Sequence, residues 1–237
     1  MNKKIIILIL IVALICGATI FVMSKNFSND NDPGTANDLS AAIKVEGKQM
    51  KWSTNTTNVD IEMPRFDNLA NNYNSFLNGK INSELSFDTV FNEVTAGMNE
   101  DEIGFFNYEV RFNRYNCYDI VSVVATQKIE FGDSRTITRK KCYNANVKDN
   151  RTAELKDVFL NKTNYKKKIM EEINAQAQKK GIELKGEKIT YLSESQVFYI
   201  MNGKLYIYFD AAEIAAASYG ELDFEMPFQL ENGLFIY

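Results

Sequence analysis

The chain of 237 residues contains no histidine. It therefore has no imidazole to complete a Ser-His-Asp triad, to act as a histidine general base or to bind zinc. No nucleophile motif replaces these groups, so we predict that the protein is not an enzyme. We also predict that it has no catalytic residue, no cofactor-binding residue and no metal-binding residue.

Cysteine is scarce as well, and only Cys117 and Cys142 lie beyond the first 24 residues. They flank a predicted hairpin that turns at residues 131–134. A regular hairpin with this tip places position 142 opposite position 123, which leaves Cys117 about six residues, roughly 20 Å, further along the strand. This geometry favours two free thiols, although an oxidising compartment would allow the pair to form a disulfide.

A long uncharged apolar run covers residues 5–23, directly after Lys3 and Lys4. A helix rises about 1.5 Å per residue and needs about 20 residues to cross the hydrocarbon core of a bilayer. Two lysines before the run and Lys25 alone behind it favour a cytoplasmic amino terminus. We therefore predict a transmembrane signal anchor at residues 1–24, a single pass through the cell membrane, and an extracytoplasmic location for the rest of the chain.

A cleaved signal peptide is the alternative, and it would make the protein secreted. Residues 5–15 can serve as its apolar region and Cys16-Gly17-Ala18 as its cleavage site. The apolar run continues through Met23, which a cleaved signal does not need. Lipidation of Cys16 is disfavoured because Ile15 occupies the place where a lipobox has Gly, Ala or Ser.

The predicted exported part, residues 24–237, is acidic. It holds 31 Asp and Glu against 25 Lys and Arg (27 minus Lys3 and Lys4), a formal charge of −6. Binding to nucleic acid depends on cationic side chains that displace phosphate counterions, so we expect no nucleic-acid partner and a cationic partner instead. The 16 Phe and 12 Tyr can form the core of one elongated domain or of two small ones.

Local patterns predict the order of the structural elements. Residues 25–42 are rich in Asn, Asp, Ser and Gly and read as a flexible stalk. Residues 58–64 alternate apolar and polar side chains like a half-buried strand, which Pro64 is expected to end. A helix follows, with Asp67 or Asn68 as its cap. Its apolar face is formed by side chains spaced three and four apart: Leu69, Tyr73, Phe76, Leu77 and Ile81.

Further patterns predict a second helix at residues 85–98 and a third at 164–180, which Gly181 ends. Strand-like runs lie at residues 104–114, 118–130, 134–143 and 222–228. The Asn202-Gly203 pair predicts a two-residue hairpin turn, with Phe198, Ile200, Leu205 and Ile207 on one face. Tyr199, Tyr206 and Tyr208 share the other face, either as covered core or as a ligand platform. Hairpin-linked strands with packed helices indicate an α+β fold with antiparallel sheet.

Several blocks resemble a known pair of exported bacterial domains. Residues 122–132, 138–144 and 155–159 resemble the middle of the RsiV-type domain. The carboxyl-terminal block resembles that domain more closely, at Phe198-Tyr199, residues 205–210, Glu213-Ile214-Ala215, Gly220 and Met226-Pro227. Residues 63–82 resemble the PdaC-type domain that usually precedes it. The resemblance divides the chain into a PdaC-like region at residues 43–145 and an RsiV-like region at residues 146–237.

Such domains form the ectodomain of anti-sigma factors that sense lysozyme and the amino-terminal region of certain peptidoglycan deacetylases. The resemblance therefore implies a non-catalytic binding or sensing module of the cell envelope, with lysozyme-like protein or peptidoglycan fragments as its partner. Four residues before the anchor leave no room for a cytoplasmic anti-sigma region, and no deacetylase domain is expected after Tyr237. An accessory subunit of a cell-wall enzyme is an alternative, as is a glycan-active enzyme that uses the carboxylates of Asp210 and Glu213.

Two loop segments are predicted to contact the partner, because binding residues concentrate on loops held by a rigid scaffold. One is the tip of the hairpin at residues 131–135, whose family counterpart often carries a histidine that is absent here. The other is the small-residue segment 211–219, where the family's Ala-Pro-Tyr is replaced. The predicted partner-binding residues are Phe131, Asp133, Arg135, Glu213, Ser218 and Tyr219.

Overall fold

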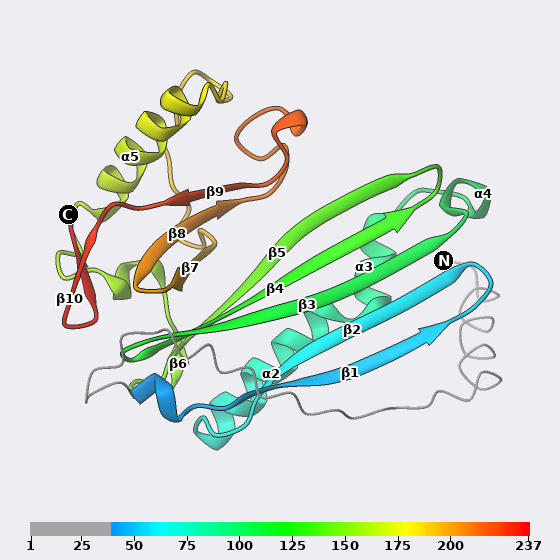
Figure 1. Cartoon of the computed structure of the whole chain (residues 1–237), viewed down its shortest axis with the longest axis horizontal. Helices are drawn as coiled ribbons and strands as arrows, with labels where there is room; N and C mark the ends of the chain where they lie inside the picture. Colours follow the sequence, from blue (N-terminus) through cyan, green and yellow to red (C-terminus); the bar gives the residue numbers. More distant parts are fainter. Residues whose placement is uncertain (1–38) are drawn as a thin grey trace.

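The computed structural model describes residues 39–237, which form two lobes (Figure 1). The predicted anchor and residues 25–38 of the predicted stalk lie outside the described part. Between residues 39 and 237, no helix is long and apolar enough to cross a membrane.

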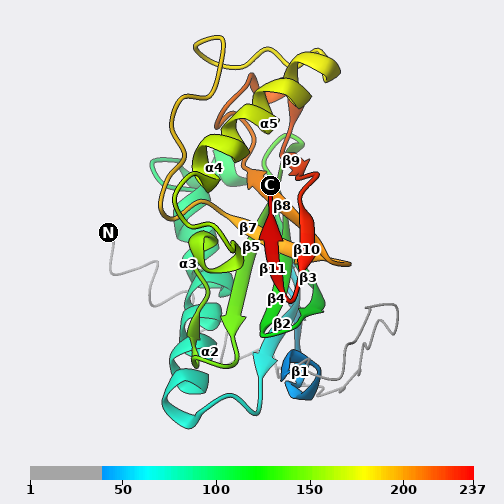
Figure 2. The ribbon, with the colours of Figure 1, turned by 90° about the vertical axis from the view of Figure 1, so that its left-hand side faces the viewer.

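The first lobe is a long six-stranded sheet in the order β1-β2-β3-β4-β5-β6. Its strands are β1 (Val45–Ser53), β2 (Thr57–Phe66), β3 (Phe106–Cys117), β4 (Ile120–Phe131), β5 (Arg135–Asn146) and β6 (Arg151–Thr152). A short 3₁₀ turn, η1 (Leu39–Ala42), precedes them. The helices α2 (Asn71–Leu85), α3 (Phe87–Val94) and α4 (Glu100–Ile103) connect β2 to β3, and α2 and α3 run along one face of the sheet (Figure 2).

All neighbouring strands of this sheet pair antiparallel except β2 and β3, which are parallel. A parallel pair needs a crossover of a dozen or more residues, which the three helices provide. The α+β prediction is confirmed, with this one parallel pair added. The hydrogen-bonded ladder between β2 and β3 ends at Ile61 and Val110. Pro64 lies beyond that point in β2, so the N–H that proline lacks is not needed for pairing with β3. The strand therefore runs on to Phe66, past the predicted end.

Two details of the predicted helix at residues 69–81 are wrong. No side chain caps α2, whose N-cap is Ala70. Asn68 instead bonds to the chain just before β1, accepting from the Lys44 N–H at 2.7 Å and donating to the Ala42 carbonyl at 2.6 Å. Phe76 is 62% exposed, although Tyr73 and Leu77 are buried as predicted. The three-and-four spacing allows a wide face, and Phe76 lies at its solvent side.

The second lobe begins with η2 (Leu155–Val158) and the long helix α5 (Tyr165–Lys180), which ends at Gly181 in the left-handed conformation. A three-stranded antiparallel sheet follows, with β7 (Phe198–Met201), β8 (Lys204–Phe209) and β9 (Leu222–Glu225). The predicted Asn202-Gly203 turn joins β7 to β8, and both residues have positive φ. The turn η3 (Ala217–Tyr219) precedes β9, and the small hairpin of β10 (Gln229–Glu231) and β11 (Leu234–Ile236) follows it.

Each lobe has its own hydrophobic core. In the first, α2 and α3 cover one face of the large sheet, with Leu77, Ile81 and Phe106 among the buried residues. In the second, α5 and the predicted apolar face of the β7–β8 hairpin bury Ile173, Leu205 and their neighbours. The hairpin between β3 and β4 links the two, because Cys117 and Ile120 belong to the core of the second lobe.

The predicted register of the β4–β5 hairpin is wrong by one residue. The strands close at the pair Phe131 and Arg135, so three residues form the loop and Cys142 lies opposite Val124. Gly132 and Ser134 both have positive φ, which makes room for the extra loop residue. Cys117 and Cys142 are free thiols, as the predicted separation favoured.

Candidate functional site

The seam between the lobes is built on the edge strand β7. The Phe198 carbonyl accepts a hydrogen bond from the Asn144 side-chain amide at 2.7 Å, and the Ile200 N–H donates to the Ser122 hydroxyl at 3.1 Å. Ser122 in turn donates to the Asn144 side-chain oxygen at 2.7 Å. All four groups are buried. Side chains of the large sheet thus satisfy a strand edge that would otherwise be left unpaired away from water.

The tyrosine face of the second lobe lies against the open face of the large sheet. Tyr199 and Tyr208 are buried beside Val124, and Tyr206 is partly buried. The rings of Tyr199 and Tyr206 stack with centroids 5.0 Å apart. The core interpretation of this face is therefore correct, and strands of the first lobe form its cover.

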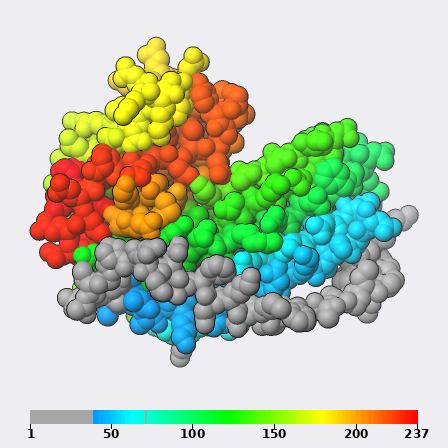
Figure 3. All heavy atoms as spheres, in the orientation of Figure 1, coloured from blue at the N-terminus to red at the C-terminus, as the bar shows by residue number. Residues whose placement is uncertain are grey.

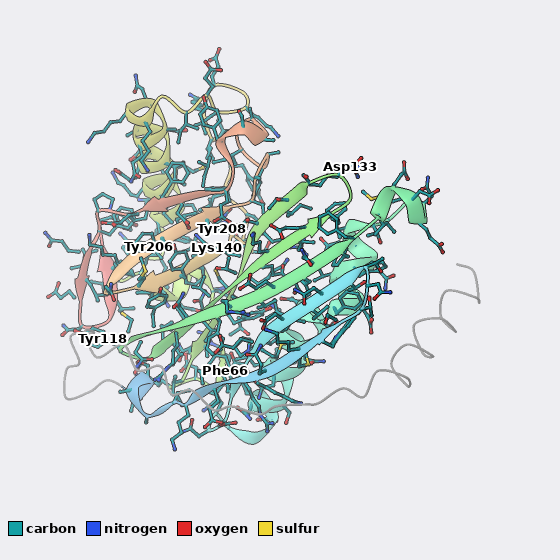
Figure 4. The ribbon with its side chains drawn as sticks, turned by 45° about the vertical axis from the view of Figure 1, so that its right-hand side comes forward. Phe66, Tyr118, Asp133, Lys140, Tyr206 and Tyr208 are labelled. Carbon is teal, nitrogen blue, oxygen red and sulfur yellow. The ribbon has the colours of Figure 1, made fainter. Side chains whose placement is uncertain are left out.

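Lys140 of β5 lies at the centre of this contact (Figure 4). Its ammonium forms an ion pair with Asp223 and lies 3.8 Å from Glu221. The same ammonium lies 5.2 Å from the ring centroid of Tyr208 and 5.8 Å from that of Tyr199. One cation is thus surrounded by carboxylates and aromatic rings at the junction of the lobes.

The hydroxyl of Tyr208 occupies an unusual position next to β5. It accepts a hydrogen bond from the Lys140 main-chain N–H at 3.0 Å and donates to Asp210 at 2.7 Å, with Glu221 3.1 Å away. Burial, followed by the bond to Asp210, raises the pKa of Tyr208 far above its usual range. Burial also raises the pKa of Tyr206 to about 12, and the bond to Glu225 adds to this effect. These phenols stay protonated and act as donors, so they cannot act as bases near neutral pH.

Asp210 and Glu213 form a turn and not an acid/base pair. The Glu213 carboxylate accepts from the Asp210 N–H at 2.9 Å, and the Glu213 N–H donates to the Asp210 carbonyl at 3.1 Å. The Asp210 carboxylate is held by Tyr208. Both carboxylates therefore have structural roles here, and Glu213 caps the turn.

Three of the predicted partner-binding residues lie together on the segment between β8 and β9. Glu213, Ser218 and Tyr219 are exposed, with 37% of Tyr219 accessible. Tyr219 also anchors the segment to the end of α5, because its hydroxyl donates to the Gly181 carbonyl at 3.2 Å and accepts from the Glu183 N–H at 3.3 Å. Replacing Tyr219 would therefore disturb the segment as well as remove a contact.

The other three lie at the tip of the β4–β5 hairpin, at the far end of the large sheet (Figure 4). Asp133 and Arg135 are exposed. Phe131 is only 3% exposed and packs against Phe106, with the Arg135 guanidinium 5.7 Å from its ring centroid. Phe131 is thus a core residue, and the expectation that its ring contacts a partner is wrong. The sequence alone does not show whether an apolar residue at a hairpin tip is exposed or buried. Phe131 is buried by contacts with parts of the chain that are distant in sequence.

A notch separates the two groups of predicted residues. The segment of residues 210–221 overhangs strand β5, and the space-filling view shows a hollow between them (Figure 3). The tip of the β4–β5 hairpin lies beyond the open end of this notch (Figure 1). The two predicted segments therefore stand on the same side of the molecule without touching in these views. Tyr208, which the sequence offered as core or as part of a ligand platform, lies at the closed end together with Lys140, which the sequence did not single out.

The carboxyl-terminal stretch of the second lobe is acidic, and its segment of residues 210–221 forms one wall of the notch. From residue 205 to residue 237 the chain has six carboxylates and no Lys or Arg: Asp210, Glu213, Glu221, Asp223, Glu225 and Glu231. Lys140 and Lys204, from outside this stretch, pair with Asp223 and Glu225. Glu213 is exposed, and no ion pair to it is found among the described residues. The absence of Lys and Arg over these 33 residues (237 − 205 + 1) is visible in the sequence, and it could have predicted an acidic surface here.

A second hollow, of about 160 Å³, lies on the open face of the large sheet. It is lined by Asn58, Asp60, Asn107, Tyr108, Glu109, Arg111, Lys128 and Glu130. Its ionic groups are paired with one another or with neighbours, Asp60 with Arg111 at 3.1 Å and Lys128 with Glu130 at 2.8 Å. Burial acts to raise the pKa of Asp60, but the hydrogen bonds and charges of Lys51 and Arg111 together hold it below its ordinary value. Its lining has three carboxylates and two cations, and each of these charged groups is already in an ion pair, so the hollow offers no unpaired charge to a ligand.

Residues 156–229 match the sequence model of DUF3298, a family described as protein of unknown function. No curated protein matches the chain. A DUF3298-family protein from Bacteroides fragilis is similar in structure, with a TM-score of 0.58 and 11% sequence identity over 83% of this chain and 94% of that one. A DUF3298-family protein from Pseudomonas aeruginosa gives a TM-score of 0.48 and 10% identity over 78% of this chain and 89% of that one. The second lobe thus contains a DUF3298 domain, and the Bacteroides likeness shows a shared fold across both lobes.

Proposed function

We propose that this protein is a non-catalytic binding or sensing module of the bacterial cell envelope, held to the membrane by residues 5–23, that recognises a lysozyme-like protein or peptidoglycan. The DUF3298 match at residues 156–229 overlaps the block of residues 198–227 on which the resemblance to the RsiV-type domain rests. The finer assignment, with a PdaC-type region before it, is part of the proposal.

One observation carries the choice of a protein partner over a glycan. The segment of residues 210–221 borders the open notch, and it carries Asp210, Glu213 and Glu221 and no basic residue. Such a surface attracts a cationic protein over distances of about a Debye length, roughly 8–10 Å at physiological salt. A neutral sugar chain gains nothing from this charge, and the exposed aromatic side chain in the segment, Tyr219, is already held by α5.

The geometry also supports a non-catalytic role. The carboxylates of the segment serve the turn between Asp210 and Glu213 or bond to Tyr208, and these arrangements use the groups that a hydrolase would need free. A second function, an accessory subunit that positions a wall enzyme, would use the same acidic wall and is separated from sensing by the identity of the partner.

The test is a titration of the full chain in detergent micelles with lysozyme and, separately, with soluble muropeptides. We expect lysozyme to bind with an association rate that falls as salt rises, because electrostatic steering acts mainly on that rate. The double variant Glu213→Gln and Glu221→Gln should slow association several-fold. Glu171→Gln and Glu172→Gln on α5 form the charge-matched control and should not. Binding of muropeptides alone would refute the choice of a protein partner over a glycan. Binding of neither ligand at high micromolar concentration would refute the proposal.

A further inference from the structure

The chain contains three Asn-Gly pairs, and the fold places each in a different environment. They are Asn78-Gly79, Asn202-Gly203 and Asn232-Gly233. Asparagine deamidates most readily before glycine, because glycine has no Cβ to hinder the attack of its main-chain nitrogen on the asparagine side chain. The reaction needs that nitrogen, a carboxamide that can turn and a backbone that can rotate. The surroundings of each pair therefore decide whether it reacts in the folded protein.

The pair in helix α2 is held on both sides. The Asn78 side-chain oxygen accepts from the Phe66 N–H at 2.9 Å, and its side-chain amide donates to the Phe66 carbonyl at 2.7 Å. Gly79 lies inside α2, where main-chain N–H groups bond to carbonyls four residues earlier. Neither the carboxamide nor the glycine nitrogen can take up the reactive arrangement, so this pair should be inert.

The other two pairs occupy turns of the same shape, one between β7 and β8 and one between β10 and β11. The φ angles of Asn202 and Gly203 are 53° and 73°, and those of Asn232 and Gly233 are 50° and 83°. Both asparagines are exposed, and between residues 39 and 237 no hydrogen bond to either carboxamide is found. In a two-residue loop the flanking residues make the closing bonds, which leaves the central glycine N–H out of the ladder. Conformation therefore does not separate these two turns.

Packing does separate them. A Cβ atom added to Gly233 would lie 2.8 Å from the Cβ and Cγ atoms of Tyr118, which packs against the second core. A Cβ atom added to Gly203 would meet nothing closer than the Leu230 Cδ2 atom at 3.6 Å, an ordinary contact. Closing the ring between asparagine and glycine rotates their peptide and moves the glycine main chain. Gly203 has room for this movement, whereas Gly233 would press on Tyr118.

We propose that Asn202 is a site of spontaneous deamidation in the folded protein, and that packing protects the same sequence at Asn78 and Asn232. The Gly203 nitrogen gives its proton to solvent and forms a bond to the side-chain carbon of Asn202. The amide group of that side chain takes a proton from solvent and leaves as ammonia. Water then opens the succinimide at either carbonyl, which gives aspartate or isoaspartate. No electrons are transferred, and water is the co-reactant.

The product would act on the contact between the lobes. Isoaspartate lengthens the main chain and adds a carboxylate in a loop whose two residues fit the pairing of β7 with β8. β7 is the strand that bonds to the first lobe through Phe198 and Ile200. Deamidation at Asn202 should therefore loosen this contact as the protein ages. The inference goes beyond the proposed recognition of an envelope partner and does not depend on it.

The test is incubation of the full chain in detergent micelles at pH 8, in water labelled with heavy oxygen. Peptide mapping by mass spectrometry then measures the label at each of the three positions. We expect conversion of Asn202 to be at least about tenfold faster than that of Asn232, a barrier difference of about 1.4 kcal/mol. Asn78 should not react. The same chain unfolded in guanidinium is the control, and there all three should react at similar rates because each precedes glycine.

The variant Tyr118→Gly tests the cause of the selectivity. Tyr118 has a φ of 53°, which glycine adopts without strain, so the variant is compatible with the turn between β3 and β4. It should speed the conversion of Asn232 and leave that of Asn202 unchanged. Conversion of Asn232 or Asn78 as fast as Asn202 in the folded parent would overturn the proposal. So would an Asn202 that reacts only in the unfolded chain, or an Asn232 rate that Tyr118→Gly does not change.

Discussion

Arg139 and Glu93 form a two-point ion pair that ties the large sheet to helix α3. The guanidinium donates to the two carboxylate oxygens at 2.5 and 2.9 Å, and it also donates to the Gln127 side chain at 2.6 Å. Arg139 is mostly buried, whereas about half of Glu93 is exposed. Paired geometry of this kind makes the ion pair more effective than a single contact at the surface.

This pair predicts an acid-dependent loss of stability. The bond from Arg139 holds the pKa of Glu93 below its ordinary value of 4.5, against the smaller opposing effect of burial. A lowered folded-state pKa contributes stability that is complete above the unfolded pKa and is lost as pH falls through the folded value. We expect Glu93→Gln to lower the free energy of unfolding by only about 1 kcal/mol at pH 7, because solvent exposure weakens the pair. The loss should be smaller at pH 3, where Glu93 of the parent protein becomes protonated.

Urea denaturation at pH 7 and at pH 3 measures this difference. Glu100→Gln, in the first turn of α4 and away from the pair, is the control for removing one carboxylate. An equal loss of stability at both pH values in Glu93→Gln would show that the pair contributes nothing through the ionised carboxylate.

The polar seam predicts a larger effect from an uncharged residue. Asn144→Leu removes the donor to the Phe198 carbonyl and the acceptor of the Ser122 hydroxyl, both of which are buried. An unsatisfied buried polar group costs about 1–3 kcal/mol, so the variant should lose roughly 2 kcal/mol or more of unfolding free energy. Thr138→Val, on the exposed part of the same strand, should change stability by less than about 0.5 kcal/mol. Thermal and urea unfolding of both variants decide the matter, and a neutral Asn144→Leu would mean that water replaces the lost bonds.

How far the sequence predicts this fold depends on whether a signal is local. The Asn202-Gly203 turn, the helix that ends at Gly181 and the apolar face of the β7–β8 hairpin follow from short-range patterns, and all three were predicted. β1 was missed, because its polar and charged residues alternate without a strong apolar period. The parallel pairing of β2 and β3 depends on a crossover of 39 residues (105 − 66), which no local pattern encodes.

The candidate site depends even more on tertiary contacts. The sequence placed Glu213, Ser218 and Tyr219 on an exposed segment, and the structure has them exposed there. It also offered Phe131 as an exposed aromatic, whereas Phe106 and the helices bury that ring. The contact between Tyr208 and Lys140 could not be predicted, because these residues are 68 positions apart and meet only when the second lobe packs onto β5.

The two thiols predict a chemical signature of the folded state. Burial raises the pKa of Cys142 to about 12, and Cys117 is buried in the second core. Because the thiolate is the reactive form, both should react with Ellman's reagent at pH 8 only as the protein unfolds. The variant Cys16→Ser removes the remaining cysteine. We expect no more than a trace of reaction in native protein and two thiols per chain in guanidinium. Rapid reaction of one thiol in native protein would show that the contact between the lobes opens at Cys142.

The contact between Gly233 and Tyr118 predicts a steric test of how the hairpin of the first lobe sits in the second. Gly233, in the turn between β10 and β11, has a φ of +83°, and a Cβ atom there would lie 2.8 Å from the Tyr118 Cβ and Cγ atoms. Gly97 has the same φ of +83° but nothing within 4 Å of an added Cβ, so Gly97→Ala measures the backbone effect alone.

Gly97→Ala should cost about 1 kcal/mol, the usual penalty of positive φ for a residue with a Cβ. Gly233→Ala should cost at least about 1 kcal/mol more. The Tyr118 Cβ and Cγ atoms pack against the second core, so they can make room for an added Cβ only if the β3–β4 hairpin shifts. Urea denaturation of both variants gives the difference. In the double variant with Tyr118→Gly, which removes the opposing Cβ, the cost of Gly233→Ala should fall to that of Gly97→Ala. Equal costs for the two single variants would mean that the β3–β4 hairpin is not fixed against the second lobe.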